Sequence, residues 1–206
     1  MPTTRTYAIS AAVVAAIGLG VGGWLALQDN GQFAECGGGV ATGAASIGGP
    51  FTLISETGET VTDADVIDRP TLLYFGYTFC PDVCPVDAAL MAHVGAGLRD
   101  KGYDVKTAFV SVDPARDTPE VVRDFADNLD EGMVGLTGTD EQIAAAAKAY
   151  RVYYQKAEGD DPEYYLMDHS AFTYFMAPEV GFLTIFRRGE TPEAMMEKAA
   201  CYLDRL

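Results

Sequence analysis

The sequence predicts an α/β protein in which helices flank a central sheet. The almost unbroken apolar and aromatic stretch at 71–77 has the composition of a strand that is buried on both faces of a sheet, and 105–112 is a second apolar strand. Each is followed by a helical pattern, and the chain ends in a predicted strand pair and a last helix. Strands that alternate with helices, followed by such a pair and a helix, indicate a βαβ unit joined to a ββα unit.

Local signals assign the individual elements in chain order. Gly58 separates two short β-rich segments, as in a hairpin, and Thr118-Pro119 places a cap residue and a proline at the start of a helix. Thr139 or Asp140 caps an Ala-rich helix. The expected elements are a hairpin at 51–54 and 60–62, a strand at 71–77, a helix at 86–101, a strand at 105–112, a helix at 119–129, a strand at 133–136, a helix at 141–150, paired strands at 152–156 and 164–167, an antiparallel pair at 173–176 and 181–187, and a last helix at 192–203. This layout is thioredoxin-like, with an added N-terminal β-hairpin and a β insertion around residues 152–170.

A membrane anchor is expected at the N-terminus. Residues 8–27 form a run of twenty residues without a charge, which is long enough to cross a bilayer. A cleaved signal peptide is the alternative, but the run is longer than the usual apolar core of one and has no convincing small-x-small cleavage site at its end. Arg5 on the short N-terminal side places the N-terminus in the cytoplasm. We therefore expect a single-pass anchor at 1–28, a flexible Gly- and Ala-rich linker at 29–49, and a thioredoxin-like domain at 50–206 that faces the periplasm from a bacterial inner membrane.

Charge and cysteine content exclude some classes of protein. The 30 Asp and Glu residues outnumber the 14 Lys and Arg, for a formal net charge of −16. Nucleic acid would require a basic patch, so it is not an expected ligand. Four cysteines in 206 residues are too few for a disulfide scaffold. Cys36 and Cys201 are open to a bridge between them, to two free thiols or to a buried Cys201.

Cys80 and Cys84 are the cysteines with a motif spacing, and they lie where the strand at 71–77 ends and a helix begins. In a helix this spacing puts both sulfurs on one face, one turn apart. The N–H groups and the dipole of a helix N-terminus lower the pKa of a thiol, so the pair can bind a soft metal ion or close a disulfide. Two sulfurs are too few for structural zinc, and soft thiolates favour Cu(I). Asp82 either tunes the charge of the site or is a solvated turn residue.

A third ligand would have to come from one of two histidines. His93 lies in the predicted helix, about 2.5 turns past Cys84 and roughly 13 Å from it along the axis, and cannot reach the pair. His169 follows a predicted strand of the insertion, and is either a ligand or a structural hydrogen-bonding residue. Two thiolates and one imidazole would form a three-coordinate Cu(I) site, or hold Cu(II) with an added oxygen ligand. Asp168 is a candidate to orient the imidazole from outside the ligand set.

Two further features have alternative interpretations. The loop at 113–119 leaves a strand in a βα unit, where sites often form. Arg116 and Asp117 could pair across it, and these residues either hold the loop in place or contact a partner. The aromatic residues at 153–175 either fill the core or form a docking face.

Three segments carry a resemblance to a known family. GYTFCPDVCP at 76–85, VDPARDTP at 112–119 and DHS at 168–170, in this order behind a single predicted anchor, are similar to the Sco (SenC) family, and the similarity extends over residues 50–206. The resemblance implies a thioredoxin-like copper protein that helps to build the binuclear copper centre in subunit II of cytochrome c oxidase. It matches Cys80, Cys84 and His169 to the copper ligands of the family.

The expected function is therefore that of a copper chaperone and not of an enzyme. The protein would bind Cu(I) or Cu(II), dock on subunit II or another copper acceptor, and pass the ion on by ligand exchange, with no small-molecule substrate. One alternative is a membrane-tethered thiol–disulfide oxidoreductase, in which Cys80 and Cys84 form a redox disulfide and reduce the cysteines of the acceptor. A redox or copper sensor is another. His169 distinguishes these functions, because disulfide exchange does not need a distant imidazole.

Overall fold

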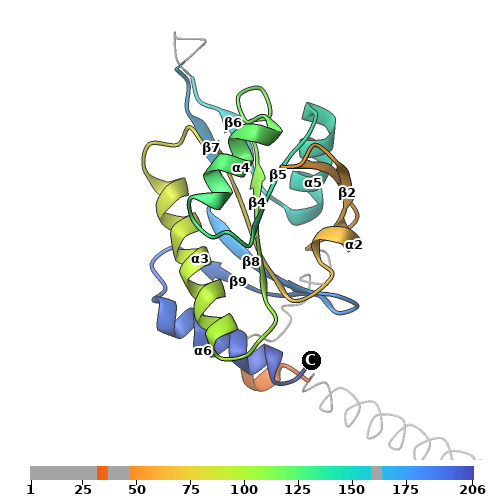
Figure 1. Cartoon of the computed structure of the whole chain (residues 1–206), viewed down its shortest axis with the longest axis vertical. Helices are drawn as coiled ribbons and strands as arrows, with labels where there is room; N and C mark the ends of the chain where they lie inside the picture. The colour runs from red at the N-terminus through yellow and green to blue at the C-terminus, as the bar shows by residue number, and fades with distance from the viewer. Residues whose placement is uncertain (1–31, 37–46, 159–163) are drawn as a thin grey trace, which may run out of the picture. The chain divides into compact units, whose positions relative to one another are not determined.

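The computed structural model describes residues 32–36, 47–158 and 164–206 (Figure 1). The chain divides into two compact units, Met1–Gly39 and Val40–Leu206. In the first unit the described residues contain one short 3-10 helix, η1 (Ala34–Cys36), inside the segment that was predicted to be a linker. The predicted anchor at 8–27 lies outside the described residues. Among the residues that are described, no helix is long and apolar enough to cross a membrane.

A seven-stranded mixed sheet forms the centre of the second unit. Its strands are β1 (Thr52–Ser55), β2 (Thr60–Thr62), β3 (Thr71–Gly76), β4 (Lys106–Ser111), β5 (Met133–Thr137), β8 (Phe172–Ala177) and β9 (Gly181–Arg187). They lie in the order β2-β1-β5-β4-β3-β8-β9. The strands β3, β4 and β5 run parallel, while β8, β9 and the β1–β2 hairpin pair antiparallel. This is the thioredoxin-like arrangement that the sequence predicts, with the added hairpin continuing the sheet beyond β5.

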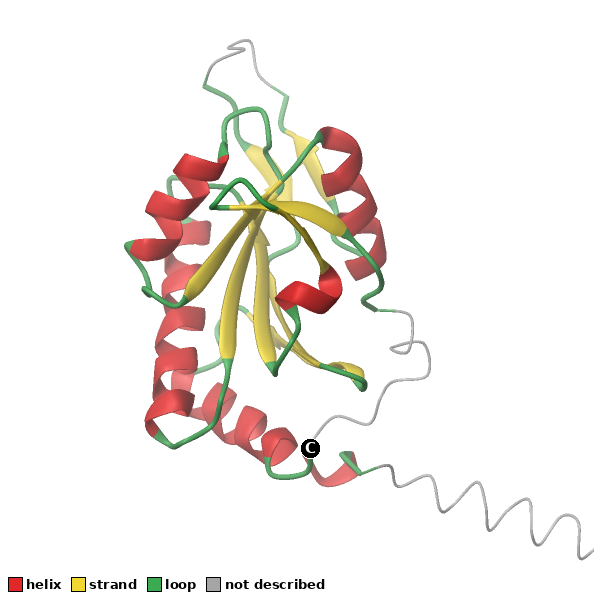
Figure 2. Cartoon of the chain, turned by 45° about the vertical axis from the view of Figure 1, so that its right-hand side comes forward, coloured by secondary structure: helices red, strands yellow, loops and turns green. Residues whose placement is uncertain are grey.

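Helices cover both faces of this sheet (Figures 1 and 2). They are α2 (Asp63–Val66), α3 (Val83–Asp100), α4 (Pro119–Asp127), α5 (Asp140–Tyr150) and α6 (Pro192–Leu203). Adjacent strand residues face opposite sides, so two neighbours in β3 show the two cores. The ring centroid of Tyr74 lies 6.3 Å from that of Phe109, which in turn lies 4.6 Å from the ring centroid of Phe125 in α4. Phe75 faces the opposite side of the sheet, where its ring centroid lies 5.3 Å from that of Tyr150 in α5. The central strand is therefore covered on both sides.

The predicted capping signals set where the helices begin. Thr118 and Thr191 each accept a hydrogen bond from an N–H group in the first turn of α4 and α6, and a proline follows each of them. Thr139, one of the two candidates, caps α5. The helix α3 begins at Val83, three residues earlier than predicted, so Cys84 lies in its first turn. The four-residue helix α2 has no counterpart in the sequence prediction.

The insertion forms a separate two-stranded sheet, which we call the β6–β7 arm (residues 152–158 and 164–170). Its strands β6 (Tyr154–Lys156) and β7 (Met167–His169) pair antiparallel, with Tyr154 opposite His169. The second strand was predicted at 164–167, and this prediction is wrong: its start is three residues and its end two residues too early. Pairing continues further along the chain than expected, because the N–H of Ser170 still donates to the carbonyl oxygen of Tyr153 at 2.9 Å. The sequence placed His169 after this strand, but His169 is its last residue.

Candidate metal centre

Cys80 lies on the turn between the carboxyl end of β3 and α3, and Cys84 lies in the first turn of α3. Both are free thiols, and they are 8% and 0% exposed. The N–H of Cys84 donates to Sγ of Cys80 at 3.3 Å. The side chain of Asp82, at the N-cap position, makes no capping hydrogen bond. The sulfur of Cys80 thus takes the place of the oxygen that normally accepts from the first turn of a helix.

The two thiols have opposite pKa shifts. Burial acts to raise the pKa of Cys80, but hydrogen bonds from the N–H groups of Cys84 and Asp82, and from the side chains of Cys84 and Tyr77, outweigh it and lower that pKa. Burial raises the pKa of Cys84, and the neighbouring Cys80 sulfur adds to the increase. Cys80 is therefore the more acidic and more reactive thiol, while Cys84 keeps its proton.

His169 reaches the dithiol from the β6–β7 arm. Its Nε2 lies 3.1 Å from Sγ of Cys84, and its Nδ1 lies 3.1 Å from the carbonyl oxygen of Ser170. A carbonyl oxygen can only accept, so Nδ1 carries the proton and Nε2 presents a lone pair to the thiol. Burial lowers the pKa of His169, which keeps the imidazole neutral. This is the tautomer in which Nε2 can bind a metal ion.

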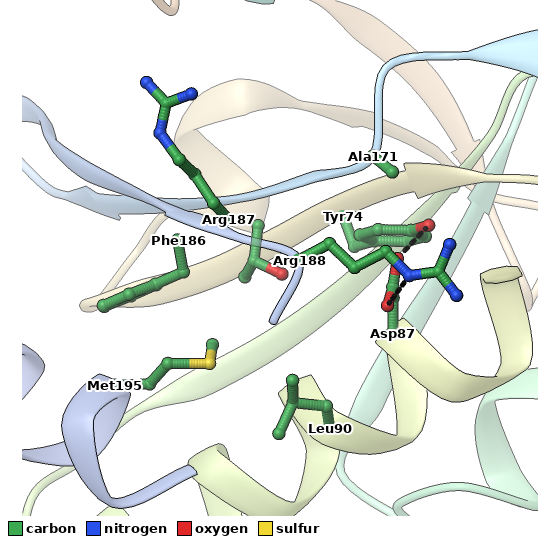
Figure 3. A pocket seen from close by; sticks show the side chains of 9 residues that line it. Tyr74, Asp87, Leu90, Ala171, Phe186, Arg187, Arg188 and Met195 are labelled. Carbon is green, nitrogen blue, oxygen red and sulfur yellow. Dashed lines mark hydrogen bonds and ion pairs between the residues drawn. The ribbon is translucent and has the colours of Figure 1, made fainter. Parts of the chain in front are cut away.

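Two buried tyrosines confine the imidazole. The rings of Tyr77 and Tyr74 meet that of His169 edge-on, with centroids 5.8 and 6.2 Å away. Burial raises the pKa of Tyr77 to about 12, so its hydroxyl stays protonated. The hydroxyl of Tyr74 donates to Asp87 at 3.3 Å, and Nε of Arg188 lies 3.8 Å from the same carboxylate. Tyr74, Asp87 and Arg188 line a small pocket (Figure 3). The sequence assigned no role to these side chains, because nothing in their spacing distinguishes them from core residues.

The structure brings three of the five predicted site residues together. Cys80 and His169 each contact Cys84, but Asp82 and Asp168 are exposed. The second nitrogen of the imidazole binds the Ser170 carbonyl group and not Asp168, which acts on the pKa of His169 only through its charge.

The contacts are pairwise and do not form a closed cage. Within 32–36, 47–158 and 164–206, no three His, Cys, Asp or Glu side chains are already arranged to hold a metal ion. His93 is exposed on α3, as the sequence predicts. A bridge between Cys36 and Cys201 stays a prediction.

The pair of Arg116 with Asp117 that the sequence allowed does not form in the loop after β4. Arg116 forms an ion pair with Asp113 instead. The carboxylate of Asp117 is fully buried and accepts hydrogen bonds from the N–H and hydroxyl groups of Thr78, at 3.0 and 2.6 Å, and from the hydroxyl of Ser111. It is turned toward the end of β3 and away from the guanidinium. The loop therefore braces the chain two residues before the first cysteine of the dithiol.

These features define a class: a thioredoxin-like α/β protein with a dithiol at the carboxyl end of its central strand and a histidine supplied by an added arm. More specifically, the chain belongs to the SCO1/SenC family, whose model matches residues 39–204. It is 49% identical to protein SenC of Rhodobacter capsulatus over 203 residues, which cover 98% of this chain and 91% of SenC. It is 39% identical to the mitochondrial protein SCO1 homolog 1 of Arabidopsis thaliana over 160 residues, 77% of this chain and 48% of that protein. The chain thus spans about half the length of this plant relative.

Solved structures show the same fold. Arabidopsis thaliana ScoI with copper bound matches with a TM-score of 0.72 and 38% identity, covering 77% of this chain and 98% of that one. BsSco, described as a member of the Sco family of cytochrome c oxidase assembly proteins that has a disulfide switch, matches with a TM-score of 0.58 and 26% identity, covering 75% of this chain and 93% of that one.

Proposed function

We propose that this chain is a copper chaperone that binds copper through Cys80, Cys84 and His169 and helps to assemble the binuclear copper centre of cytochrome c oxidase subunit II. The proposal rests above all on the approach of Nε2 of His169 to 3.1 Å from Sγ of Cys84, with Nδ1 already engaged by a carbonyl group. Disulfide exchange does not require a distant imidazole as a ligand, whereas a three-coordinate metal site requires a third one. The copper bound to Arabidopsis ScoI and the place of BsSco among cytochrome c oxidase assembly proteins support the proposal.

The donor set suits copper as cargo. Thiolate sulfur and imidazole nitrogen are ligands that Cu(I) prefers, and Cu(II) would take an added oxygen ligand. Only a thiolate binds, so loading displaces the proton of Cys84 and replaces its hydrogen bond to His169. Loading also draws the three ligand atoms around one centre. The ion then passes by ligand exchange to the thiolates of subunit II or of another copper acceptor.

The proposed location follows from the N-terminal sequence. Residues 8–27 would anchor the chain in a bacterial inner membrane, and the linker would present the domain to a membrane-bound acceptor on the periplasmic side. Nucleic acid and small-molecule substrates have no place in this function.

A second candidate is thiol–disulfide exchange with the acceptor. The opposite pKa shifts of Cys80 and Cys84 favour it, as does the disulfide switch of BsSco. The Cys80 thiolate would attack a disulfide of the acceptor, forming a mixed disulfide and releasing one acceptor thiolate. Cys84, after passing its proton to Nε2 of His169, would attack Sγ of Cys80 and release the second acceptor thiolate. The acceptor gains two electrons, and this chain is left with a Cys80–Cys84 disulfide. A redox or copper sensor would use the same residues.

Copper titration of the reduced protein distinguishes these candidates. The wild-type chain should bind one Cu(I) tightly in competition with a chromophoric chelator, and His169→Ala should lose that tight binding. His93→Ala is the matched control, because His93 is exposed on α3 and should leave the affinity unchanged. Unchanged affinity in His169→Ala would remove His169 from the ligand set and favour the oxidoreductase. In cells, normal copper loading of the oxidase in a Cys80→Ser strain under limiting copper would count against both functions.

A further inference from the structure

We infer that Arg116 is a positioning residue, whose guanidinium group fixes the β6–β7 arm against the dithiol turn and thereby sets the position of His169. The inference rests on the proposed function, because it concerns the third ligand of that site.

The arm has little of its own to hold it in place. It consists of two strands of three residues each, in a sheet apart from the seven-stranded one. A two-stranded ribbon is at best marginally stable in water. Side-chain contacts with the rest of the domain therefore determine where His169 lies.

Arg116 ties the arm to the loop after β4. Its Nη1 donates to the carbonyl oxygen of Tyr165 at 2.9 Å, and its guanidinium carbon lies 3.7 Å from the centroid of the Tyr165 ring. The hydroxyl of Tyr165 donates to Asp113 at 2.7 Å, and Asp113 is also the ion-pair partner of Arg116. The side chains of this pair are only 18% and 3% exposed. The largely buried Arg116–Asp113 pair thus binds both the backbone carbonyl and the side-chain hydroxyl of Tyr165, which lies four positions before His169.

The same guanidinium contacts the dithiol turn. It lies 4.6 Å from the ring centroid of Phe79, which directly precedes Cys80, and 5.8 Å from that of Tyr77, which packs edge-on against His169. Its Nη2 is buried and has no hydrogen-bond partner among the described residues. Burial of a cation that has an unused hydrogen-bond donor is unfavourable in free energy. We therefore attribute the position of the guanidinium to stacking against these rings and not to complete hydrogen bonding. Lysine has no planar group that could contact all three segments in this way.

This arrangement predicts a loss of copper affinity that depends on His169. Arg116→Gln and Arg116→Lys should each weaken Cu(I) binding by about 10- to 100-fold, the usual effect of removing a group that orients a metal ligand. In a His169→Ala background the same substitutions should cause no further loss. Arg123→Gln is the matched control, because Arg123 is 45% exposed on α4 and contacts Asp124 at 3.6 Å.

A metal-free measurement tests the position of the imidazole directly. The chain has two histidines, so the ring signals of the full chain in detergent micelles resolve into one for the buried His169 and one for the exposed His93. In the reduced apo-protein, Arg116→Gln should shift the ring signals of His169, as they leave the edges of Tyr74 and Tyr77, and leave those of His93 in place. In the Cu(II) form, pulsed EPR should show a weaker coupling to imidazole nitrogen.

The outcomes separate the inference from the proposed function. Unchanged affinity and unchanged His169 signals in Arg116→Gln would overturn the inference and leave the function standing, as would an equal loss of affinity in the His169→Ala background. If His169→Ala alone leaves affinity unchanged, the proposed ligand set fails, and the apo-protein spectra still decide whether Arg116 places the imidazole. Should the Arg116 variants not fold, Tyr165→Leu removes the same contact from the other side and must shift the His169 signals if the inference holds.

Discussion

Replacing Asp117 by alanine should destabilise the domain. The buried Asp117 carboxylate accepts from the N–H and hydroxyl groups of Thr78 and from the hydroxyl of Ser111. In the variant the N–H of Thr78 cannot turn to another acceptor, and this alone costs about 1 to 3 kcal/mol. The two hydroxyls can rotate, so they add less, and the loss of a buried carboxylate whose pKa burial raises offsets part of the total. We expect a net decrease of about 2 to 4 kcal/mol in the free energy of unfolding.

Urea unfolding of the full chain in detergent micelles, followed by near-UV circular dichroism of the tyrosines, measures this change from the midpoint at constant slope. Asp117→Asn keeps one acceptor oxygen and should lose only about 1 to 2 kcal/mol. Asp124→Ala makes the same chemical change on a side chain that is 75% exposed, where a change within about 0.5 kcal/mol is expected. If Asp117→Ala is no more destabilised than Asp124→Ala, the carboxylate does not brace the end of β3 as argued.

Two further predictions concern protonation. Burial lowers the pKa of His169 below its usual 6.5, so as the pH falls the unfolded chain takes up a proton on this imidazole before the folded chain does. The free energy of unfolding should therefore be unaffected by His169 above about pH 6.5. Below that pH it should decrease by up to about 1.4 kcal/mol per pH unit. Urea unfolding between about pH 7.5 and 5.5 should show this slope in wild type and in His93→Gln; its persistence in His169→Gln would contradict the assignment. Iodoacetamide should modify Cys80 before Cys84, with a midpoint below pH 9.0, because the pKa of Cys80 is lowered from that value and that of Cys84 is raised. Peptide mass mapping after timed alkylation gives the order, and modification of Cys84 first would refute it.

The sequence predicted those elements whose signals are local. The last helix begins and ends where expected, at Pro192–Leu203, because Thr191 and the following proline specify its start. β3 was evident because both of its faces are apolar. The start of α3 was placed three residues too late. Pro85 lies in its first turn, where a proline gives up no hydrogen bond and is tolerated. The four residues of α2 are too few to show a helical period.

For the site, the sequence predicted the residue types but not their contacts. The spacing of Cys80 and Cys84 and the position of His169 made them candidates, and the structure brings them together in pairs. The group that orients the imidazole could not be predicted, because it is the backbone carbonyl of Ser170 and every residue type carries such a group. Arg116 likewise has an acid three residues before it and another directly after it. Only tertiary packing determines that Asp117 is fully buried and that Asp113 forms the ion pair with Arg116.

The hydrogen bond from the N–H of Cys84 to the sulfur of Cys80 also bears on the reduction potential of the dithiol. This bond and the helix dipole stabilise a thiolate, which exists only in the reduced protein, whereas a disulfide carries no charge and accepts more weakly. About 1.4 kcal/mol of such stabilisation raises the potential of a two-electron couple by about 30 mV. The start of α3 therefore resists oxidation of the pair and favours the reduced sulfurs that a soft metal ion requires.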